Sequence, residues 1–574
     1  MASKPKATCV RTGPDETSAS ERPWLKAYPQ GVAWDAAFKP SLMGDLLDQA
    51  VKAYGARPCI YFMGKRLSFT EIGALSDRAA KGLRALGVGE GVKVGLLLPN
   101  SPAFVIFYYG VLKAGGTIVN FNPLYSLEEI EFQIRDSGAK IMVTLDLALT
   151  FGKIEALLKS GALDKAVVAS FTAQLPALKS VGFKLTQRMH LANASASPAK
   201  GKMVLERDLL ANDGNYERPA ITPDAIAVLQ YTGGTTGTPK GAMLTHANLS
   251  TNVAQVKLWQ NRPAPEGDRM LGILPLFHVF AMTTVLNFGI VSGMEIILLP
   301  KFEVIETLKL IGKLRPTMMP GVPTLFNAIL RHPHIANFDL SSLEYCISGG
   351  AALPLEVKRG FEALCRVSVV EGYGLSETSP VVTCNPVKTR REGSIGLPLP
   401  GTEISIRSLE DPAVAMPQGE PGEICIAGPQ VMTGYWRKPD DTESSFVGRF
   451  FRSGDVGYMD EDGFIFIVDR IKDMINASGF KVYPRRIEDA LYEHGAIAEV
   501  IVVGIPDEYR GEAPKAYVKL KEGQEATGAE LLQFLRGKLS KIELPAEIEF
   551  RDQLPKTMVG KPSKKELRAE ATKR

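Results

Sequence analysis

The sequence lacks the patterns that mark several classes of protein. Its six cysteines are scattered and form no C-x-x-C pair, which disfavours a disulfide framework or a structural zinc site and fits a reducing cytoplasm. The net charge of +4 is small for 574 residues, and no basic stripe with interleaved aromatic residues stands out. Nucleic acid is therefore not an expected partner. The chain has no G-x-S-x-G segment to support a hydrolase, and no internal repeat.

Long apolar segments are also scarce. The basic residues near the N-terminus precede no apolar core, so residues 1–40 are interpreted as a polar tail and not as a secretory signal. Residues 271–294 carry no charge and are long enough to span a bilayer, but Pro275 and Asn287 interrupt them. We expect a buried segment that lines an internal cavity.

Residues 175–189 alternate apolar and basic side chains, a pattern that suits a membrane surface. We expect a cytoplasmic protein, and peripheral association with the inner face of the membrane stays open. A homodimer also stays open, because the sequence does not reveal the oligomeric state.

The first third of the chain alternates helix and strand patterns. Ser126 and Glu129 form a capping box that opens one of the helices, and another helix follows Pro102. Short apolar runs between the helices indicate buried strands at 94–98, 117–120 and 140–144. This succession predicts an α/β fold, with parallel sheets flanked by helices. A polar stretch rich in Ala, Ser and Lys, residues 172–218, is interpreted as an insertion with loop character.

The end of the chain has shorter elements. A helix opens at Pro484, a strand covers 500–503, and another helix lies near 528–538. We therefore predict a large N-terminal domain of several subdomains over 41–471 and a small, mobile α+β domain over 472–574.

The strongest chemical signal is a loop between Thr232 and Lys240. It holds three glycines, four threonines and one lysine, which together offer free backbone N–H groups, hydroxyl donors and a positive charge to a polyphosphate. It is not a Walker A loop, because Lys240 stands between Pro239 and Gly241. A flexible turn is the alternative. The candidate ATP-binding residues of this loop are Thr232, Gly233, Gly234, Thr235, Thr236, Gly237 and Lys240.

This loop resembles the phosphate loop of the acyl-adenylate-forming superfamily, which comprises acyl-CoA synthetases, luciferases and peptide-synthetase adenylation domains. Residues 371–379 resemble its adenine and magnesium segment. The resemblance implies that Tyr373 stacks on adenine, Ser376 meets the α-phosphate and Glu377 holds Mg²⁺. By the same resemblance, Gly349, Gly372 and Gly374 also bind ATP.

Two further segments extend the resemblance. Asp455 corresponds to the ribose-binding aspartate, Arg470 to a ribose or phosphate contact, and Lys472 to the pivot of the hinge. Lys561 corresponds to the adenylation lysine, which neutralises charge as the carboxylate attacks the α-phosphate. Without that context, a lysine near a basic C-terminus is most often a solvated charge.

The segment just beyond the hinge resembles the loop that serves the thioester step. The resemblance implies that Gly479 and Phe480 bind coenzyme A, with Gly479 allowing the backbone to approach the pantetheine arm. Since one site then catalyses two reactions, the small domain must rotate to exchange Lys561 for Gly479.

The acyl pocket is expected around two apolar segments. His278 and Phe280 resemble the gate beside the reacting carboxylate, where His278 orients the acid and is not needed as a base, because the carboxylate is already ionised. A satisfied core histidine is the competing interpretation. The pocket walls are expected at Gly321, Val322, Pro323, Gly350 and Ala351.

Within the superfamily the chain is similar to bacterial long-chain fatty-acid–CoA ligases over about residues 40–570. The implied function is ligation of a long- or medium-chain acid to coenzyme A, with ATP, Mg²⁺ and coenzyme A required. Phe450-Phe-Arg-Ser-Gly-Asp455 replaces the usual Trp-x-His-Thr-Gly-Asp, and Pro562-Ser-Lys-Lys replaces an Arg-rich run.

These departures leave the identity of the acid open. A dicarboxylate–CoA ligase of the pimeloyl type is the main alternative. A ligase that loads a carrier protein, a luciferase-like oxygenase and a non-catalytic scaffold are further alternatives, because each could retain the same fold.

Overall fold

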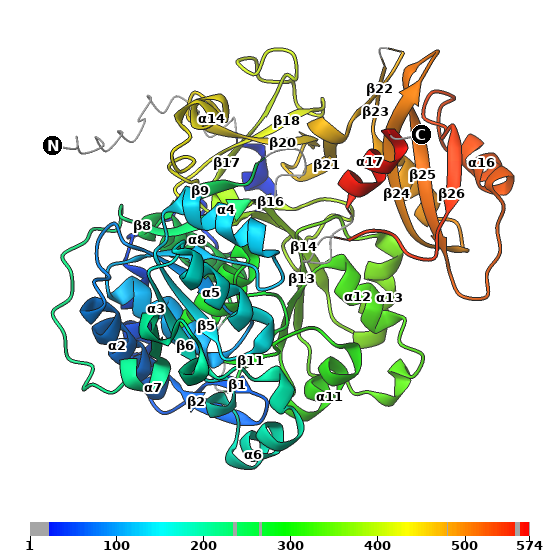
Figure 1. Cartoon of the computed structure of the whole chain (residues 1–574). Coiled ribbons are helices and arrows are strands. Elements are labelled where there is room, and N and C mark those ends of the chain that lie inside the picture. Colours follow the sequence, from blue (N-terminus) through cyan, green and yellow to red (C-terminus); the bar gives the residue numbers. More distant parts are fainter. Residues whose placement is uncertain (1–21, 233–237, 263–266, 479, 557–562, 573–574) are drawn as a thin grey trace.

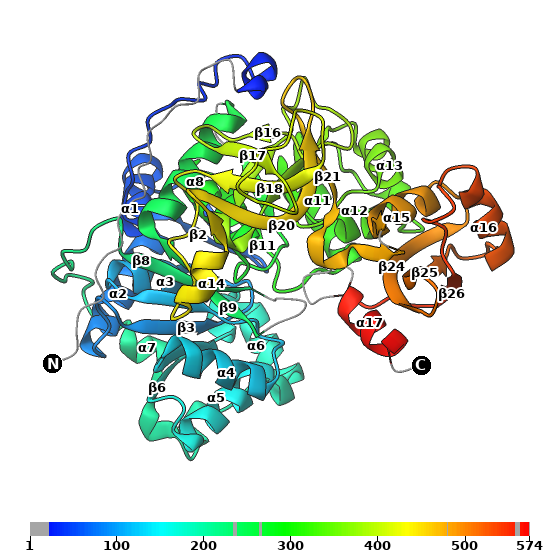
Figure 2. The same ribbon diagram turned by 90° about the horizontal axis from the view of Figure 1, so that it is seen from above.

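The structure is a computed structural model that describes residues 22–232, 238–262, 267–478, 480–556 and 563–572. A large body contains everything up to β21 (Ile465–Arg470), and a smaller body follows it. The smaller body lies to one side and is coloured orange to red in Figures 1 and 2. The predicted fold class is confirmed: parallel sheets and helices form the large part, and a small α+β unit ends the chain.

The first sheet of the large body is mostly parallel. Among the described residues it has seven strands in the order β7-β6-β5-β3-β4-β8-β9, and only the β8–β9 pair is antiparallel. The strands are β3 (Lys93–Leu97), β4 (Thr117–Asn120), β5 (Ile141–Leu145), β6 (Lys165–Ala169), β7 (Met203–Leu205), β8 (Ile226–Thr232) and β9 (Lys240–Thr245). The three strands expected near 94–98, 117–120 and 140–144 are confirmed.

The second sheet has a parallel centre and antiparallel edges. In the described part of the chain its order is β16-β15-β14-β13-β12-β10-β11-β1-β2, with parallel pairing from β14 to β1. The strands are β1 (Pro58–Phe62), β2 (Lys65–Ser68), β10 (Arg269–Gly272), β11 (Glu295–Leu298), β12 (Met318–Gly321), β13 (Tyr345–Ser348), β14 (Val369–Gly374), β15 (Val381–Cys384) and β16 (Leu397–Pro398). Parallel strands direct their carboxyl ends to one edge, where ligands commonly bind.

Two smaller sheets complete the strand arrangement. One belongs to the large body and is antiparallel: β17 (Glu403–Arg407), β18 (Gly422–Ala427), β19 (Phe446–Val447), β20 (Phe450–Met459) and β21. The other belongs to the small body: β22 (Ile475–Ala477), β23 (Phe480–Val482), β24 (Ile497–Asp507), β25 (Gly511–Leu520) and β26 (Glu547–Phe550).

The helices cover the sheets and fill the space between them. Those before the phosphate loop are α1 (Met43–Tyr54), α2 (Phe69–Ala85), α3 (Pro102–Lys113), α4 (Leu127–Ser137), α5 (Ala148–Ser160), α6 (Ala177–Thr186) and α7 (Glu206–Leu209). After it come α8 (His246–Gln260), α9 (Val279–Ala281), α10 (Phe288–Val291), α11 (Val304–Leu314), α12 (Pro323–Leu330), α13 (Leu355–Cys365) and α14 (Pro439–Ser444). The small body adds α15 (Pro484–Tyr492), α16 (Gly528–Arg536) and α17 (Lys564–Thr572).

The main core lies between the two large sheets. Every residue of α3 is buried, and the Tyr109 hydroxyl at its centre donates to Asn287 Oδ1 over 2.9 Å. Asn287 ends a π-helical turn, Met282–Asn287, in the uncharged stretch 271–294. Most of that stretch is buried, as predicted, and among the described residues no helix is long and apolar enough to span a membrane.

The smaller body has its own apolar core. Ile487 of α15 and Leu531 of α16 pack on β24 and β25 without contributing to the main core. A single 3-10 turn, Ile471–Asp473, joins β21 to β22. The separate cores and the short connection are what a hinged domain requires.

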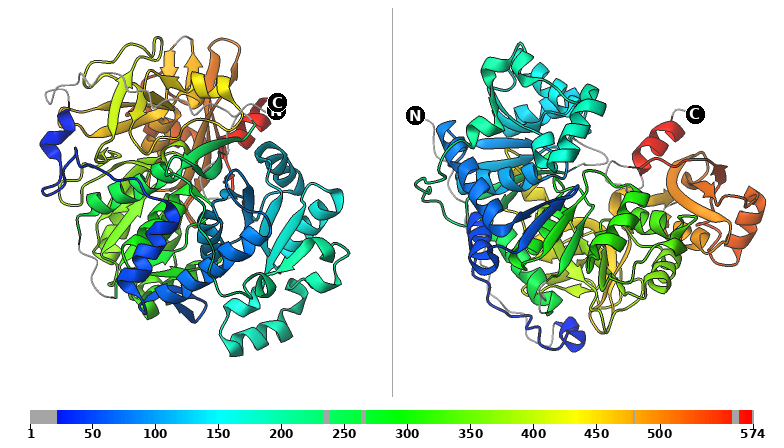
Figure 3. Two further views of the ribbon diagram at one scale, coloured as in Figure 1. Left: turned by 90° about the vertical axis from the view of Figure 1, so that its left-hand side faces the viewer. Right: turned by 90° about the horizontal axis from the view of Figure 1, so that it is seen from below.

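Two predictions differ from the structure. Residues 172–218 are not a loop throughout, because they include α6 and the short apolar strand β7, which pairs in parallel with β6. Part of the predicted tail packs on the large body: Trp24 is buried, and the Trp34 indole donates to Thr402 O over 3.0 Å. The aromatic side chains of this strap explain the difference; Figure 3 shows it along the outside of the molecule.

Candidate active site

The phosphate loop connects the two antiparallel strands β8 and β9. Thr232, at the end of β8, pairs with Lys240, at the start of β9. The loop residues Gly233, Gly234, Thr235, Thr236 and Gly237 lie outside the described residues. The Lys240 ammonium forms an ion pair with Asp441 of α14 and lies 5.2 Å from the centre of the Tyr435 ring.

Tyr435 belongs to a segment that runs beside β9. Met243 N donates to Gly434 O over 2.9 Å, and Trp436 N donates to Gly241 O over 2.8 Å. This pairing fixes the Tyr435 side chain, whose hydroxyl donates to Glu377 Oε1 over 2.8 Å. Lys240 of the phosphate loop and Glu377, the candidate magnesium ligand, therefore both contact Tyr435.

Glu377 is the candidate metal ligand. Burial raises the pKa of its carboxyl, and the hydrogen bond from Tyr435 opposes that shift by stabilising the charged form. In the described part of the chain no three His, Cys, Asp or Glu side chains converge into a metal site. One carboxylate is nevertheless a fitting donor set for Mg²⁺, which keeps several waters and uses phosphate oxygens as its other ligands.

Glu377 follows a strand whose glycines are required by close packing. A Cβ atom on Gly374 would lie 1.8 Å from Pro380 O, and one on Gly372 would lie 3.0 Å from Ile347 Cδ1. Neighbouring backbone therefore excludes any side chain at Gly374. Ser376 begins the 3-10 turn that includes Glu377, so both side chains project from the same turn.

A buried aspartate connects this strand to the end of the large body. Asp455 of β20 accepts a hydrogen bond of 2.6 Å from the Tyr373 hydroxyl and pairs with Arg470 Nε at 3.0 Å. Its side chain is only 4% exposed. Burial and the Asp455 charge raise the pKa of Tyr373 well above its ordinary value, and the same charge raises the pKa of Arg470. All three candidates for adenine and ribose binding thus lie in one network.

The predicted acyl gate lies against the nucleotide segment. A Cβ atom on Gly349 would lie 3.0 Å from Phe280 Cζ and 3.3 Å from Gly372 O, so these three residues are neighbours. Half-buried His278 caps the short helix α9, its Nδ1 accepting from Phe280 N over 3.2 Å. The backbone thus orients the ring, and the arrangement is compatible with either predicted role.

The predicted pocket walls occupy the ends of the parallel strands. Gly349 N donates to Gly321 O over 3.1 Å, and the Phe326 ring fills the space beside Gly321. Val322 and Pro323 begin α12. Gly350 and Ala351 are exposed in the next loop.

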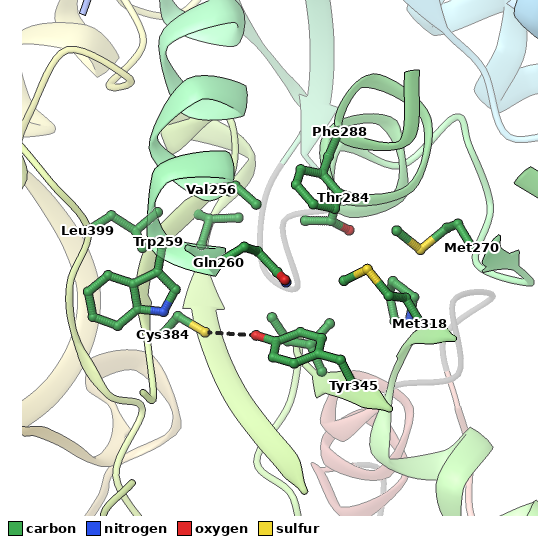
Figure 4. A pocket seen from close by; sticks show the side chains of 13 residues that line it. Val256, Trp259, Gln260, Met270, Thr284, Phe288, Met318, Tyr345, Cys384 and Leu399 are labelled. Atoms are coloured by element: carbon green, nitrogen blue, oxygen red, sulfur yellow. Dashed lines mark hydrogen bonds between the residues drawn. The ribbon is translucent and has the colours of Figure 1, made fainter. Parts of the chain in front are cut away.

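A narrow apolar cavity lies deeper between the strands (Figure 4). It offers about 30 Å³ to the centres of water molecules. None of the predicted wall residues lines it. Its lining comes from strands of the second sheet, α8, the π-helical turn Met282–Asn287, α10 and the residue after β16: Val256, Trp259, Gln260, Met270, Thr284, Phe288, Met318, Pro320, Tyr345, Ile347, Val381, Cys384 and Leu399.

Two contacts connect this cavity with the nucleotide segment. Ile347 lines the cavity and packs against Gly372, where a Cβ atom would lie 3.0 Å from Ile347 Cδ1. Thr284 also lines it and donates through its hydroxyl to Phe280 O over 2.8 Å. The lining of the cavity therefore packs against the predicted gate.

An ion pair connects the hinge with the C-terminal helix α17. Exposed Lys472 lies in the connecting turn, and its neighbour Asp473 pairs with Arg568 of α17 at 2.9 Å. Lys564, also on α17, pairs with Glu488 of α15 at 3.0 Å. These contacts anchor the segment that follows Lys561.

Two predicted residues of the small body are outside the described residues. Lys561 is one of residues 557–562, which are not described. The described residues that flank this range are bonded to each other: Ser563 N donates to Pro555 O over 2.9 Å. Gly479 precedes Phe480, which begins β23 and is 65% exposed.

Sequence reasoning missed several residues of this site. Tyr435 and Asp441 lie far along the chain from the partners that they contact, Glu377 and Lys240. The one available signal was the Gly-Tyr-Trp run at 434–436, an aromatic pair after a glycine in an otherwise polar segment.

Two family models match this chain. One, described as AMP-binding enzyme, matches residues 47–436, and the other, described as AMP-binding enzyme C-terminal domain, matches residues 486–561. The chain belongs to the AMP-binding enzyme family. The resemblance inferred from the motifs is thereby confirmed.

Known AMP-binding enzymes resemble the chain over almost its whole length. The long-chain-fatty-acid–CoA ligase of Bacillus subtilis (strain 168) is 42% identical over 96% of this chain and 99% of its own. The enzyme of the same name from Escherichia coli O157:H7 is 36% identical over 96% and 98%.

Solved structures of this family share the fold. ATP-bound MatB from Rhodopseudomonas palustris has a TM-score of 0.80 at 28% identity and covers 92% of this chain and 98% of its own. The anthranilate CoA ligase AuaEII with anthranoyl-AMP has a TM-score of 0.82 at 25% identity, with coverage of 94% and 99%.

Proposed function

We propose that this chain is an ATP-dependent fatty acid–CoA ligase. It converts an acid, ATP and coenzyme A into acyl-CoA, AMP and diphosphate through an acyl-adenylate. The observation that carries the proposal is the joining of Lys240, Tyr435 and Glu377 beside the Tyr373–Asp455–Arg470 network. Family membership and the named relatives support the same reaction class.

The nucleotide would lie along these two groups of residues. The adenine would stack on Tyr373, and Asp455 would accept from the ribose hydroxyls, as carboxylates do in nucleotide sites. The phosphates would contact the Thr232–Lys240 loop, Gly349, Gly372, Gly374, Ser376 and Arg470. Mg²⁺, held by Glu377, would neutralise charge on the phosphates.

In the first step the carboxylate oxygen of the acid attacks the α-phosphorus, and the bond to the leaving diphosphate breaks. His278 and Phe280 would orient the acid; the nearness of Phe280 to Gly349, which itself adjoins Gly372, and the hydrogen bond from Phe280 N to His278 Nδ1 support this role. Lys561 supplies positive charge to the transition state. No general base is required, because the acid is already ionised near neutral pH.

In the second step the thiol sulfur of coenzyme A attacks the acyl carbon and AMP leaves. Gly479 and Phe480 serve this step after the small body turns about Lys472. The separate core of that body and the single connecting turn, Ile471–Asp473, support such a rotation.

The acyl chain is proposed to enter the cavity between the strands. In the described part of the chain no charged side chain lines that cavity. A second carboxylate buried there would have no partner, which is costly, whereas each buried methylene contributes about 0.8 kcal/mol. The dicarboxylate alternative is therefore less supported than a monocarboxylate of medium or long chain, in agreement with the relatives' names.

A Lys561→Ala variant tests the first step directly. We expect diphosphate release to fall by at least about 100-fold, while the thermal unfolding midpoint and the conversion of supplied acyl-adenylate to acyl-CoA are retained. Lys565→Ala, a change at a lysine on α17, is the matched control. An unaffected rate of diphosphate release in Lys561→Ala would refute the assigned role.

The acid and the acceptor are identified by a substrate panel. Mono- and dicarboxylic acids of increasing length are compared by coenzyme-A-dependent AMP formation. Formation of acyl-AMP without acyl-CoA when coenzyme A is present would favour the carrier-protein alternative. Efficient turnover of long dicarboxylates would refute the assignment of the apolar cavity as the acyl site.

The proposal also covers association of the protein with a membrane or with a second copy of itself. We propose a protein of the cytoplasm that binds the inner membrane surface reversibly through its exposed apolar residues. A homodimer is the competing use of the same residues, and the two are separated by the experiment described next.

A further inference from the structure

The surface around α6 is unusual for a soluble domain. Leu178 is 90% exposed, Leu185 78% and Met189 82%, and Val181 is also exposed. We call these four residues the α6 face. Single exposed apolar residues are ordinary, but a contiguous group of this kind usually marks an interaction surface.

The geometry of the helix concentrates these side chains on one side. With about 100° between successive residues, Leu178, Val181 and Leu185 fall within about 60° of one another. Phe183 points the opposite way, where its ring packs 5.0 Å from that of Phe171. The helix is therefore anchored by one aromatic residue and presents the α6 face outward.

The segment that carries the α6 face is basic, although Asp146 of another segment interacts with Lys184. Residues 165–205 contain no Asp or Glu, but they include Lys179 and Lys184 on α6 and Arg188 just after it. Lys184 lies on one flank of the apolar stripe and Arg188 follows its end, whereas the Lys179 ammonium donates to Met63 O over 2.9 Å on the packed side of the helix. An apolar stripe flanked by cations is the pattern of helices that lie in the plane of an anionic membrane.

The position of α6 leaves the proposed catalytic motion unhindered. Figure 1 shows α6 at the bottom of the large body, remote from α16 and the rest of the small body. A surface bound to α6 would not block rotation about the connecting turn Ile471–Asp473.

We infer that the α6 face docks the protein reversibly on an anionic lipid bilayer, with its apolar side chains inserted and its cations on the headgroups. The inference rests on the proposed function in one respect: a bilayer is the phase in which long-chain acids dissolve. A second copy of the chain is the competing occupant, but it would have to bring acidic groups to match Lys184 and Arg188.

Vesicle sedimentation with the full-length protein tests this inference. Vesicles of phosphatidylcholine alone are compared with vesicles that also contain phosphatidylglycerol. The double variant Leu178→Ser/Leu185→Ser is expected to bind the anionic vesicles at least about tenfold more weakly than the natural chain. Lys184→Gln and Arg188→Gln should each weaken binding about fivefold, and added salt should weaken it further.

The matched control is Leu124→Ser/Val414→Ser, which removes two exposed apolar residues outside the α6 face. Control and natural chain should bind alike. Equal binding by the natural chain and the α6 double variant, or no binding by either, overturns the inference. A dimer that the α6 double variant converts to a monomer, without vesicle binding, also overturns it and assigns the face to a second copy.

Activity on a water-soluble, medium-chain acid separates this inference from the proposed function. All variants should retain that activity, because the α6 face is remote from the site. Lack of the activity in the natural chain, with vesicle binding intact, would refute the proposed function and leave the docking surface standing.

Discussion

The small volume of the apolar cavity leads to a prediction about the enzyme's preference for acyl-chain length. Met318 pairs in register with Tyr345 and Met270, and all three line the cavity. Met318 precedes Gly321 by three residues, so this level lies about 10 Å below the carboxyl end of the strand. The room there is about 30 Å³, whereas ligand pockets usually measure hundreds of Å³, so the lining must move to admit a long chain.

Methionine is suited to such movement, because its unbranched side chain has several rotatable bonds. Met318→Ile keeps the volume but introduces a β-branched side chain that is stiff at its first torsion. Each methylene that can no longer be buried loses about 0.8 kcal/mol, which is about fourfold in kcat/KM. Across four methylenes, from a 12-carbon to a 16-carbon acid, the loss is at most about 3 kcal/mol, or about 200-fold.

The assay is kcat/KM for coenzyme-A-dependent AMP formation over a series of straight-chain acids. Short acids should be converted equally well, and the profile of Met318→Ile should stop rising at a shorter acid than that of the natural chain. Met319→Ile is the matched control, because Met319 is buried on the opposite face of the same strand. Parallel profiles for Met318→Ile and the natural chain, or an equal effect of Met319→Ile, would refute the reasoning.

Three further predictions follow from single contacts. Tyr435→Phe removes the hydrogen bond that opposes protonation of Glu377; titration of activity with Mg²⁺ should show a several-fold higher requirement, and an unchanged curve would contradict the link. Burial raises the pKa of Glu206 from 4.5 to about 7, so the folded state holds this proton more tightly, and stability falls as pH rises from 4.5 through 7. Glu206→Gln should therefore stabilise the protein by up to about 3 kcal/mol at pH 8 and little at pH 4.5 in urea unfolding, and an equal effect at both pH values would contradict this cause. Asp441→Asn frees the phosphate-loop lysine of its partner and should lower KM for ATP by up to about fivefold, with Asp440→Asn as the control; a raised KM would mean that Asp441 positions the lysine.

Much of the fold was accessible from the sequence because its signals are local. Capping boxes and buried apolar runs located several helices and strands within one or two residues, as the capping box of Ser126 and Glu129 shows. The helix α6 was not predicted, because it lies in a stretch interpreted as a loop from its Ala, Ser and Lys content, and its apolar residues face outward and not into the core. The strap at Trp24 and Trp34 was missed because its partners lie hundreds of residues away.

The residues of the site also fall into those that the sequence could predict and those that it could not. Residues within contiguous motifs, such as Tyr373 and Glu377, could be named from their segment. The cavity lining could not, because it is assembled from alternate positions of several strands, and period-2 positions such as Met318 and Tyr345 carry no chemical signature. The glycines were identified, but their reasons differ: Gly374 avoids a backbone collision, whereas Gly321 makes room for a phenylalanine ring of the protein itself.

The two described cations of the nucleotide site have carboxylate partners within the protein. Lys240 is paired with Asp441, and Arg470 is paired with Asp455. A phosphate or ribose that approaches either cation must compete with that partner, so its affinity reflects the difference between the two interactions and not the full attraction to a free charge. The pairs also hold both cations near their working positions, which lowers the entropy lost when substrate binds. Since the Lys240–Asp441 pair is partly exposed, its own contribution is small, and exchange of partners there can be nearly balanced in free energy. Near balance is what an enzyme that must release AMP after every cycle requires.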